Sequence, residues 1–252
     1  MCNPTRNDGS SQSDMVPKEK RPYFQRYWSW ADVARAVTVT TVHFLCLLAP
    51  FNYKWEALRF GLILVAVTNL LITFSYHRNL AHRSFKLPKW LEYPIAYAAV
   101  FALQCGGRNN VTDLKKQWFY RFLRKTIGFH VLMFWIVLYL YGGLPYLTCG
   151  GGIGGVLGYH VTWLVNSACH IWGSRSWKTK DTSRNVWWLS IFTMGESWHN
   201  NHHAFESSAR QGLEWWQIDI TWYLIRLFEV LGLATDVKLP SEFQKQKLAL
   251  VR

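Results

Sequence analysis

The histidines of one short segment, residues 196–205, have the spacing of a metal site. His199, His202 and His203 form the pattern H-x-x-H-H. On an α-helix each residue turns by about 100°, so the second and third imidazoles lie within about 60° of the first. Three imidazoles on one narrow face can bind a transition metal. The alternative interpretation of the segment is a polar surface turn that happens to contain histidines. We predict a metal site here, and Glu196 could orient one of its imidazoles.

Two more pairs of polar residues stand at the ends of long apolar stretches. His77 and His82 form the pattern H-x-x-x-x-H directly after one stretch. Asn166 and His170 lie four residues apart near the end of another, so they share one helix face. Polar residues inside a membrane span are costly and usually functional. The alternative is that Asn166 makes a hydrogen bond between helices while His170 reaches toward the interface. If both stretches end on one side of a membrane, these pairs and the H-x-x-H-H segment form one site.

The donor set of this site would be rich in nitrogen and free of thiolate. Such a set suits iron, zinc or copper, and iron is the one that supports oxygen chemistry on an unactivated C–H bond. The five cysteines are scattered and form no C-x-x-C pair, which argues against a disulfide framework and a zinc ribbon. We expect them to be small buried residues. We expect His43, His130 and His160, which stand apart, to pack or to make hydrogen bonds.

The apolar residues come in blocks of membrane length. The chain has 252 residues, of which 50% are hydrophobic, and a net charge of +13. Four stretches are close to the roughly 20 residues that a spanning helix needs. They are approximately residues 31–51, 58–76, 127–146 and 150–172. Nucleic-acid binding is one reason for a basic chain, but these stretches favour a basic surface that rests on an anionic membrane.

The distribution of lysine and arginine predicts the topology. Short connections join the first stretch to the second and the third to the fourth, and Lys54 is almost their only basic residue. Nearly all other basic residues lie on the opposite side, which the positive-inside rule places in the cytosol with both termini. We therefore predict an all-α integral membrane protein with four transmembrane helices and a cytosolic helical cap. A soluble protein would have to bury four helices that have no amphipathic face.

The composition of the remaining segments predicts whether each is disordered, interfacial or closely packed. Residues 1–22 are polar and form a predicted disordered tail, and residues 23–252 form one membrane domain. The tail has no apolar signal core and no arginine- and serine-rich leader, which favours the endoplasmic reticulum membrane over a plastid. Residues 88–104 are apolar but short, so we expect an interfacial or re-entrant helix. The six glycines from Gly150 to Gly158 predict close packing of the fourth span on its neighbours.

Three motifs, in this order along the chain, carry a family resemblance: HRNLAH, NSACHIWG and GESWHNNHH. With the predicted spans around them, they resemble the membrane fatty-acyl desaturases. The C-terminal half resembles the plant Δ9-type acyl-lipid and acyl-CoA desaturases through the segments GSRSWKTKDTSRNVWWLS and HHAFESSARQGLEWWQID. The resemblance extends from the first aromatic residues after the tail to the end of the chain.

The resemblance implies an iron enzyme with a cytosolic cap. Members of this family hold two irons and use O2 and electrons from cytochrome b5 to place a cis double bond in a saturated acyl chain. No HPGG haem motif occurs here, so cytochrome b5 would be a separate partner. The residues that match the family's metal ligands are His77, His82, His170, His199, His202 and His203, with Asn166 reaching a metal through water. The residues that could receive an acidic head group, such as coenzyme A or a phospholipid, are Arg175, Lys178, Arg184 and Asn185, although a solvated basic surface is the alternative.

One element of the family pattern is missing. A second histidine box, also of the form H-x-x-H-H, is expected before the third span, yet no histidine occurs between His82 and His130. The chain around Gln104–Gly106 resembles a join from which about fifty residues have been excised. The loss of three histidines predicts fewer than two bound irons and impaired oxygen activation. Two alternatives remain: a catalytically silent member that pairs with intact desaturases through its spans, and a lipid-binding protein with one metal or none.

Overall fold

The computed structural model describes residues 28–102 and 112–250, so the predicted tail and the join at Gln104–Gly106 lie outside it. The described residues fall into two units, one that ends at Thr38 and one that begins at Val39 and contains the candidate site. Across the described ranges the regular structure is helical, and the β-bridges are isolated pairs. The elements are α1 (Trp30–Leu48), η2 (Ala49–Asn52), α2 (Trp55–Leu71), η3 (Ile72–Ala81), α3 (Lys89–Ala99), η4 (Val100–Ala102), α4 (Thr112–Lys116), α5 (Trp118–Pro145), η5 (Tyr146–Ile153), α6 (Gly154–Ile171), η6 (Trp187–Leu189), α7 (His199–Ala204), α8 (Ile220–Val230) and α9 (Glu242–Leu248).

Three helical stretches are long and apolar enough to cross a membrane: Asp32–Asn52, Trp55–Ala81 and Trp118–Ile171. The last of them contains both of the final two predicted spans, because the π-helical segment η5 joins α5 to α6. The backbone at Gly142 and Gly143 is not helical, and Gly143 has a φ of 66°, so the chain kinks there. The all-α membrane fold is confirmed, and the count of four crossings stays a prediction.

The connecting ends of the helical hairpins pack against each other. The Sγ atom of Cys149 lies 3.8 Å from the carbonyl oxygen of Ala49, and both residues belong to a buried cluster with Ala57. A Cβ on Gly61 would lie 2.8 Å from the Cys149 carbonyl oxygen, and one on Gly154 would lie 3.1 Å from that of Gly61. The prediction of close packing from small residues is therefore confirmed, and the opposite ends of α2 and α6 lead into the cap.

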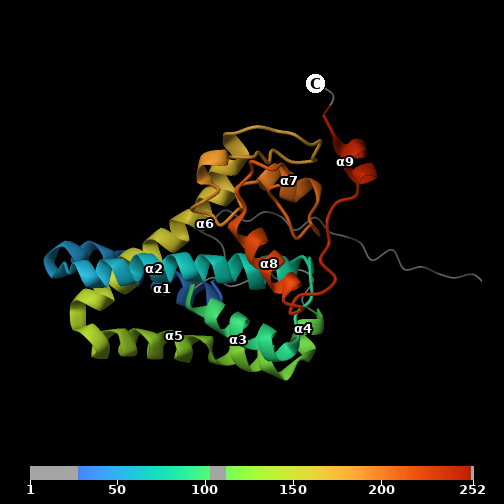
Figure 1. The fold of residues 1–252 in the computed structure, drawn as a ribbon. Helices are drawn as coiled ribbons and strands as arrows, with labels where there is room; N and C mark the ends of the chain where they lie inside the picture. The colour runs from blue at the N-terminus through green and yellow to red at the C-terminus, as the bar shows by residue number, and fades with distance from the viewer. Residues whose placement is uncertain (1–27, 103–111, 251–252) are drawn as a thin grey trace, which may run out of the picture. The chain divides into compact units, whose positions relative to one another are not determined.

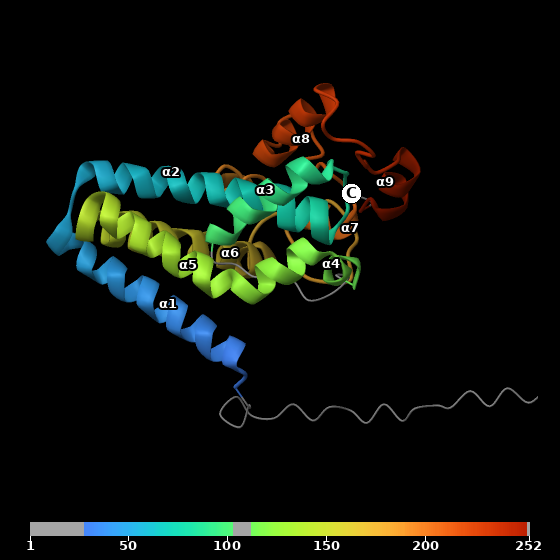
Figure 2. The ribbon, with the colours of Figure 1, turned by 90° about the horizontal axis from the view of Figure 1, so that it is seen from below.

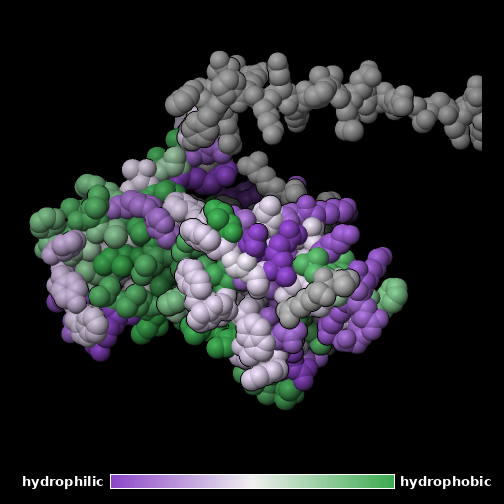
Figure 3. All heavy atoms as spheres, turned by 90° about the horizontal axis from the view of Figure 1, so that it is seen from above, coloured by the Kyte–Doolittle hydropathy of each residue, from purple (hydrophilic) through white to green (hydrophobic). Residues whose placement is uncertain are grey.

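The cap is formed by residues 172–250, and α8 packs against η3, the π-helical end of α2 (Figure 1). The core of this contact contains Phe74 and Phe85 from the α2 side and Ile225 from α8, whose side chains are at most 1% exposed. Figure 3 shows hydrophobic residues predominating over the long helices and hydrophilic residues over the cap. This distribution is the one expected of a membrane protein whose cap meets water.

The short apolar segment predicted as an interfacial helix forms α3 and η4. Figure 2 shows α3 beside α2, where the Tyr76 hydroxyl donates to the Ala96 carbonyl at 2.8 Å. On its other side, the Tyr120 hydroxyl of α5 donates to Glu92 at 2.7 Å. The segment is therefore helical and packed between two of the long helices, while its depth in a membrane stays a prediction.

Candidate metal centre

Six histidines of the predicted site gather into two groups of three. In the first group, one ring nitrogen each of His77, His82 and His202 lies within 4.8 Å of the others. The ring centroids are 4.7 Å apart for His77–His82, 4.7 Å for His77–His202 and 4.6 Å for His82–His202. We call this group the first trio. Two of its members come from the end of α2 and one from α7, so tertiary folding assembles it.

The helix type explains how the H-x-x-x-x-H pattern brings two imidazoles to the same face of a helix. In an α-helix, a residue five positions along points about 140° away, because each residue turns by about 100°. Residues Ile72–Ala81 instead form a π-helix, whose hydrogen bonds join residues five apart. The His82 amide accordingly donates to the His77 carbonyl at 3.0 Å. One π-helical turn therefore places both imidazoles on the same face.

The second group, which we call the second trio, contains His170, His199 and His203. Its ring centroids are 4.9 Å apart for His170–His199, 5.7 Å for His170–His203 and 4.3 Å for His199–His203. The Nε2 atoms of His170 and His199 are 3.1 Å apart. The rings of His202 and His203 are 5.5 Å apart, so the trios are neighbours. A single short helix, α7, therefore gives one histidine to the first trio and two to the second.

Buried asparagines hold α7 in place. The Asn185 side chain accepts hydrogen bonds from the amides of Asn200 and Asn201, at 3.0 and 3.1 Å, and donates to Asn201 Oδ1 at 2.7 Å. Asn200 Oδ1 in turn accepts from the amides of Ser176 and Trp177, at 2.8 and 2.9 Å. Asn185 is only 3% exposed. It therefore ties the loop after α6 to the histidine helix, and its polar atoms are already engaged within the cap.

A buried carboxylate supports the first trio. Glu196 Oε2 lies 2.5 Å from His77 Nδ1 and accepts a hydrogen bond from Gln211 Nε2 at 3.1 Å. Burial raises the pKa of Glu196, but His77 and Arg78 more than offset it and lower the pKa to about 2, so the side chain is charged at neutral pH. A carboxylate on one ring nitrogen fixes the imidazole and leaves the other nitrogen for a metal. Glu196 thus contacts an imidazole as expected, although that imidazole comes from α2.

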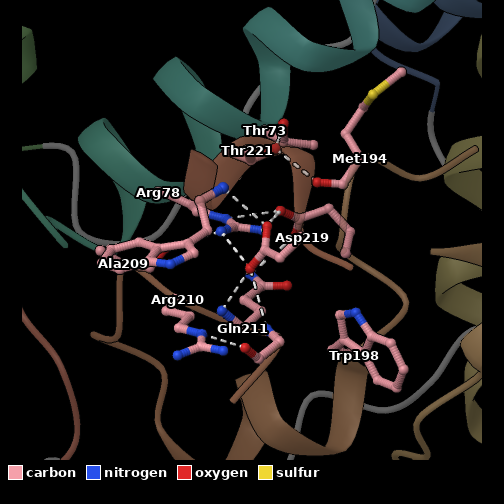
Figure 4. Close-up of polar contacts among 12 residues, drawn as sticks. Thr73, Arg78, Met194, Trp198, Ala209, Arg210, Gln211, Asp219 and Thr221 are labelled. Carbon is pink, nitrogen blue, oxygen red and sulfur yellow. Dashed lines mark hydrogen bonds and ion pairs between the residues drawn. The ribbon is translucent and has the colours of Figure 1, made fainter. Parts of the chain in front are cut away.

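An arginine pairs with this carboxylate and with a second acid, and Figure 4 shows that arginine, Arg78, against the second acid, Asp219. Arg78 Nη2 and Nη1 lie 2.9 and 3.0 Å from the two carboxylate oxygens of Asp219, and its Nε donates to Glu196 Oε1 at 3.1 Å. Its Nη1 also donates to the Ala209 carbonyl at 2.8 Å. Arg78 and Asp219 are 1% and 0% exposed. Sequence reasoning missed both residues, although a cation between two histidines at the end of an apolar stretch was a signal that a partner was needed.

Another carboxylate supports the second trio, and sequence reasoning missed it too. Asp181, in the loop after α6, pairs with Nδ1 of His203. The neighbouring Thr182 hydroxyl lies 3.2 Å from Nδ1 of His170. Burial raises the pKa of Asp181, but hydrogen bonds from Ser183 and the pairing with His203 hold it well below its usual range. Each trio therefore has its own charged carboxylate on one of its imidazoles.

Three of the six imidazoles, those of His82, His199 and His202, are in the neutral state that binds metals. Burial, followed by neighbouring imidazoles, lowers the pKa of His82 to about 4 and that of His199 to about 3. The same causes hold the pKa of His202 well below its usual value. His202 Nδ1 is also buried without a hydrogen-bond partner among the residues that the structure describes. Neutral imidazoles with free lone pairs, beside two charged carboxylates, fit a transition-metal cation.

Several of the predicted residues lie outside both trios. Asn166 is exposed, and its side-chain amide donates to the Thr162 carbonyl of its own helix at 2.9 Å. His43 and His160 face each other, with their Nε2 atoms 3.5 Å apart, and His130 lies 3.2 Å from the hydroxyl of Tyr97. The expectation that these three histidines make hydrogen bonds or pack is confirmed. The role of Asn166 toward a metal stays a prediction.

The other head-group candidates lie on the loop after α6. The Arg175 guanidinium donates to the carbonyl of Asp181 at 3.0 Å, and Arg184 donates to that of Gly173 at 3.1 Å. Lys178 is exposed. These three cations are close in the sequence to the support of the second trio, and head-group binding by them stays a prediction.

The sequence of this chain is similar to known proteins of one family. Residues 75–231 match the family model described as fatty acid desaturase. The Delta-9 desaturase-like 5 protein of Arabidopsis thaliana is 73% identical over the whole of both chains. The Delta-9 acyl-lipid desaturase 1 of the same plant is 52% identical over 93% of this chain and 92% of its own length. A chloroplastic palmitoyl-monogalactosyldiacylglycerol delta-7 desaturase is 46% identical over 92% and 76%, respectively.

The lengths of these alignments bear on the predicted excision. The alignment with the Delta-9 desaturase-like 5 protein covers 299 positions, whereas this chain has 252 residues, so at least 47 positions have no counterpart here. That number agrees with the predicted loss, while its place at Gln104–Gly106 stays a prediction. Because the family model covers more than half of the chain and the relatives align along it, this chain belongs to the fatty acid desaturase family.

Proposed function

We propose that this protein is an iron-dependent fatty-acyl desaturase of the Δ9 type whose activity is impaired by the loss of one histidine box. The observation that carries the proposal is the gathering of six histidines into two trios at the cap ends of α2 and α6, in a chain of the desaturase family. Iron held there would supply the oxidising chemistry that removes two hydrogens from a saturated acyl chain. The residues that would hold it are His77, His82 and His202 in the first trio and His170, His199 and His203 in the second.

The chain's own residues bind and orient. Glu196 and Asp181 fix one imidazole in each trio, which leaves the other ring nitrogen of His77 and of His203 for a metal. The apolar helices would admit the acyl chain from the membrane. Arg175, Lys178 and Arg184 would receive an acidic head group near the second trio. We leave Asn185 out of this set, because its polar atoms hold α7.

Impairment follows from the number of ligands. Each trio offers three nitrogens, a set that serves zinc in catalytic sites but leaves positions open. Iron(II) binds a given nitrogen site less tightly than cobalt, copper or zinc. The shortfall of at least 47 positions against a relative is large enough to contain a histidine box. We therefore expect fewer than two tightly bound irons per chain, even where zinc or cobalt fills both trios.

The setting follows from the predicted topology. Both termini and the cap lie in the cytosol, and the membrane is that of the endoplasmic reticulum. Electrons come from a separate cytochrome b5. The acyl carrier is coenzyme A or a glycerolipid; the name of the Delta-9 acyl-lipid desaturase 1 favours a lipid.

Two measurements test the proposal. In a yeast that lacks its own Δ9 desaturase, weak growth without added oleate that disappears in a His199→Ala variant would support impaired catalysis. The Delta-9 desaturase-like 5 protein serves as the full-length control. Elemental analysis of the purified chain should give fewer than two irons. A ratio of two, with full rescue of the yeast, would refute the impairment, and absence of any metal binding would refute the proposed site.

A silent partner role is the second candidate, and the missing positions favour it. Such a chain would pair with an intact desaturase through its apolar helices and change the activity of that desaturase. Co-purification with a tagged full-length relative from membranes, together with absence of rescue by this chain alone, would support it. Absence of both pairing and rescue would leave the lipid-binding alternative, which binding of a radiolabelled acyl lipid would test.

A further inference from the structure

We propose that Arg78 is a positioning residue: together with Asp219 it holds the Glu196 carboxylate on His77, and it thereby sets the metal affinity of the first trio alone. This inference rests on the proposed metal-binding function. We call Arg78, Glu196 and Asp219 the Arg78 network. Its members lie on three segments, namely the π-helical end of α2, the segment before α7 and the N-cap position of α8.

The contacts of the network form an unbroken series that ends at a metal ligand. The guanidinium meets both oxygens of Asp219, at 2.9 and 3.0 Å, and reaches one oxygen of Glu196 with its Nε atom at 3.1 Å. The other oxygen of Glu196 lies 2.5 Å from His77 Nδ1. A planar guanidinium that binds one carboxylate with two nitrogens has a fixed orientation. Arg78 therefore determines where the Glu196 carboxylate lies, and Glu196 determines how the His77 ring is turned.

The charges of the network fit a cation on the first trio. All three side chains are at most 10% exposed, and together they carry a formal charge of −1. A divalent metal on the nearby imidazoles would compensate that charge. Without Arg78, two buried carboxylates would face each other with no cation between them, which is costly and would displace Glu196.

Asp219 is itself fixed by the cap. Its oxygens accept hydrogen bonds from the amides of Trp222, Gln211 and Gly212, at 3.0, 2.8 and 3.1 Å. Gly195, which has a φ of 104°, lies so close that a Cβ there would be 2.4 Å from Asp219 Oδ1. The network thus connects the first trio to the backbone of the cap and not merely to one flexible side chain.

The second trio does not share this support. Its carboxylate is Asp181, which lies in a different loop and pairs with His203. A change at Arg78 should therefore weaken one trio and spare the other. A general loss of packing would weaken both, so the comparison separates a positioning role from a merely structural one.

The experiment measures Co²⁺ binding to the full chain in lipid nanodiscs, by visible absorption. In a His203→Ala background the first trio remains intact, and in a His77→Ala background the second does. We expect Arg78→Gln to weaken Co²⁺ binding about 10- to 100-fold in the first background and by less than about two-fold in the second. Arg226→Gln is the matched control, because Arg226 pairs with Glu229 on the exposed side of α8.

Equal weakening at both trios, or unchanged affinity at the first, would overturn the inference. If Arg78→Gln does not fold, Arg78→Lys makes the same comparison, because lysine keeps the charge but lacks the forked geometry. It should weaken the first trio alone by at least about three-fold, which is part of the effect of losing an outer partner, and unchanged affinity would overturn the inference. A wild-type chain that binds no Co²⁺ would overturn the proposed function, and this inference with it.

Discussion

The two trios contain the same kind of ligand but differ in how the rest of the molecule supports them. The first is backed by a buried carboxylate, Glu196, whose side chain is 10% exposed and which is paired with a buried arginine. The second is backed by Asp181, whose side chain is 38% exposed and lies in a loop. Three imidazoles define a possible site in both cases. The carboxylates that contact the imidazoles, and the cation paired with one of them, therefore determine how rigid each site is and how strongly solvent screens its charges.

Loss of a ligand should give the largest effect and tests whether there are two sites at all. His202 and His203 are neighbours on α7 but belong to different trios. His202→Ala should lower the Co²⁺ affinity of the first trio by more than about 100-fold, because losing a ligand costs more than losing its outer partner. His203→Ala should do the same to the second. The measurement is a Co²⁺ titration of each variant by visible absorption, in which each occupied trio contributes its own absorption. Equal loss of both contributions in either variant would show that the six histidines act as one site.

Removal of the carboxylate that contacts each trio should show how differently the two trios depend on it. Glu196→Gln should weaken the first trio about 10- to 100-fold, whereas Asp181→Asn should weaken the second by about 10-fold or less, because solvent already screens Asp181. Isothermal titration with Zn²⁺ in backgrounds that retain one trio provides both numbers. The comparison would fail if Asp181→Asn had the greater effect.

Acidification of the metal-free protein should act through both trios. The pKa of His82 is about 4 and that of His199 about 3, against 6.5 for an ordinary histidine. Between these values the unfolded chain binds protons that the folded chain does not, so stability is complete above pH 6.5 and falls as the pH decreases toward 4. We expect the Tm to drop by at least about 2 °C over that interval, the effect of roughly 1–2 kcal/mol in a chain of this size.

Glutamine variants assign this pH dependence to the trios. His199→Gln should flatten the Tm profile more than His82→Gln, because the pKa of His199 is displaced further from its ordinary value. Differential scanning fluorimetry in detergent, with chelator present, gives the profiles. A wild-type Tm that is constant from pH 6.5 to 4 would contradict the depressed pKa values.

Asn166 should give the smallest effect. Its side chain is bonded to its own helix and belongs to neither trio. Asn166→Ala should change Co²⁺ affinity at each trio by less than about two-fold, well below the cost of losing an outer partner of a metal ligand. A ten-fold loss confined to the second trio would instead show that Asn166 reaches that metal through water, as the family resemblance implies.

Helical periodicity and hydropathy were sufficient for the fold class. A long apolar stretch in a membrane forms a helix, because every backbone amide must then make its hydrogen bond within the same segment. The helix α5 begins at Trp118, nine residues before the predicted third span, because its first turns extend outside the apolar block, and the bounds of the span itself stay a prediction. The spans thus follow from local composition, whereas the extension of α5 contacts α3, through Tyr120 with Glu92 and Phe119 with Tyr93.

Spacing and hydropathy alone identified which histidines gather at the candidate centre, because clustered imidazoles at the ends of apolar stretches have few other uses. The division of these histidines into two trios depends on folding, since a π-helical turn aligns His77 with His82 and α7 directs His202 away from His199 and His203. Arg78 and Asp219 are far apart along the chain, and Asp181 lies in a loop without periodicity. Which charges support which ring depends on chain segments that meet only after folding, so no local pattern could have identified them.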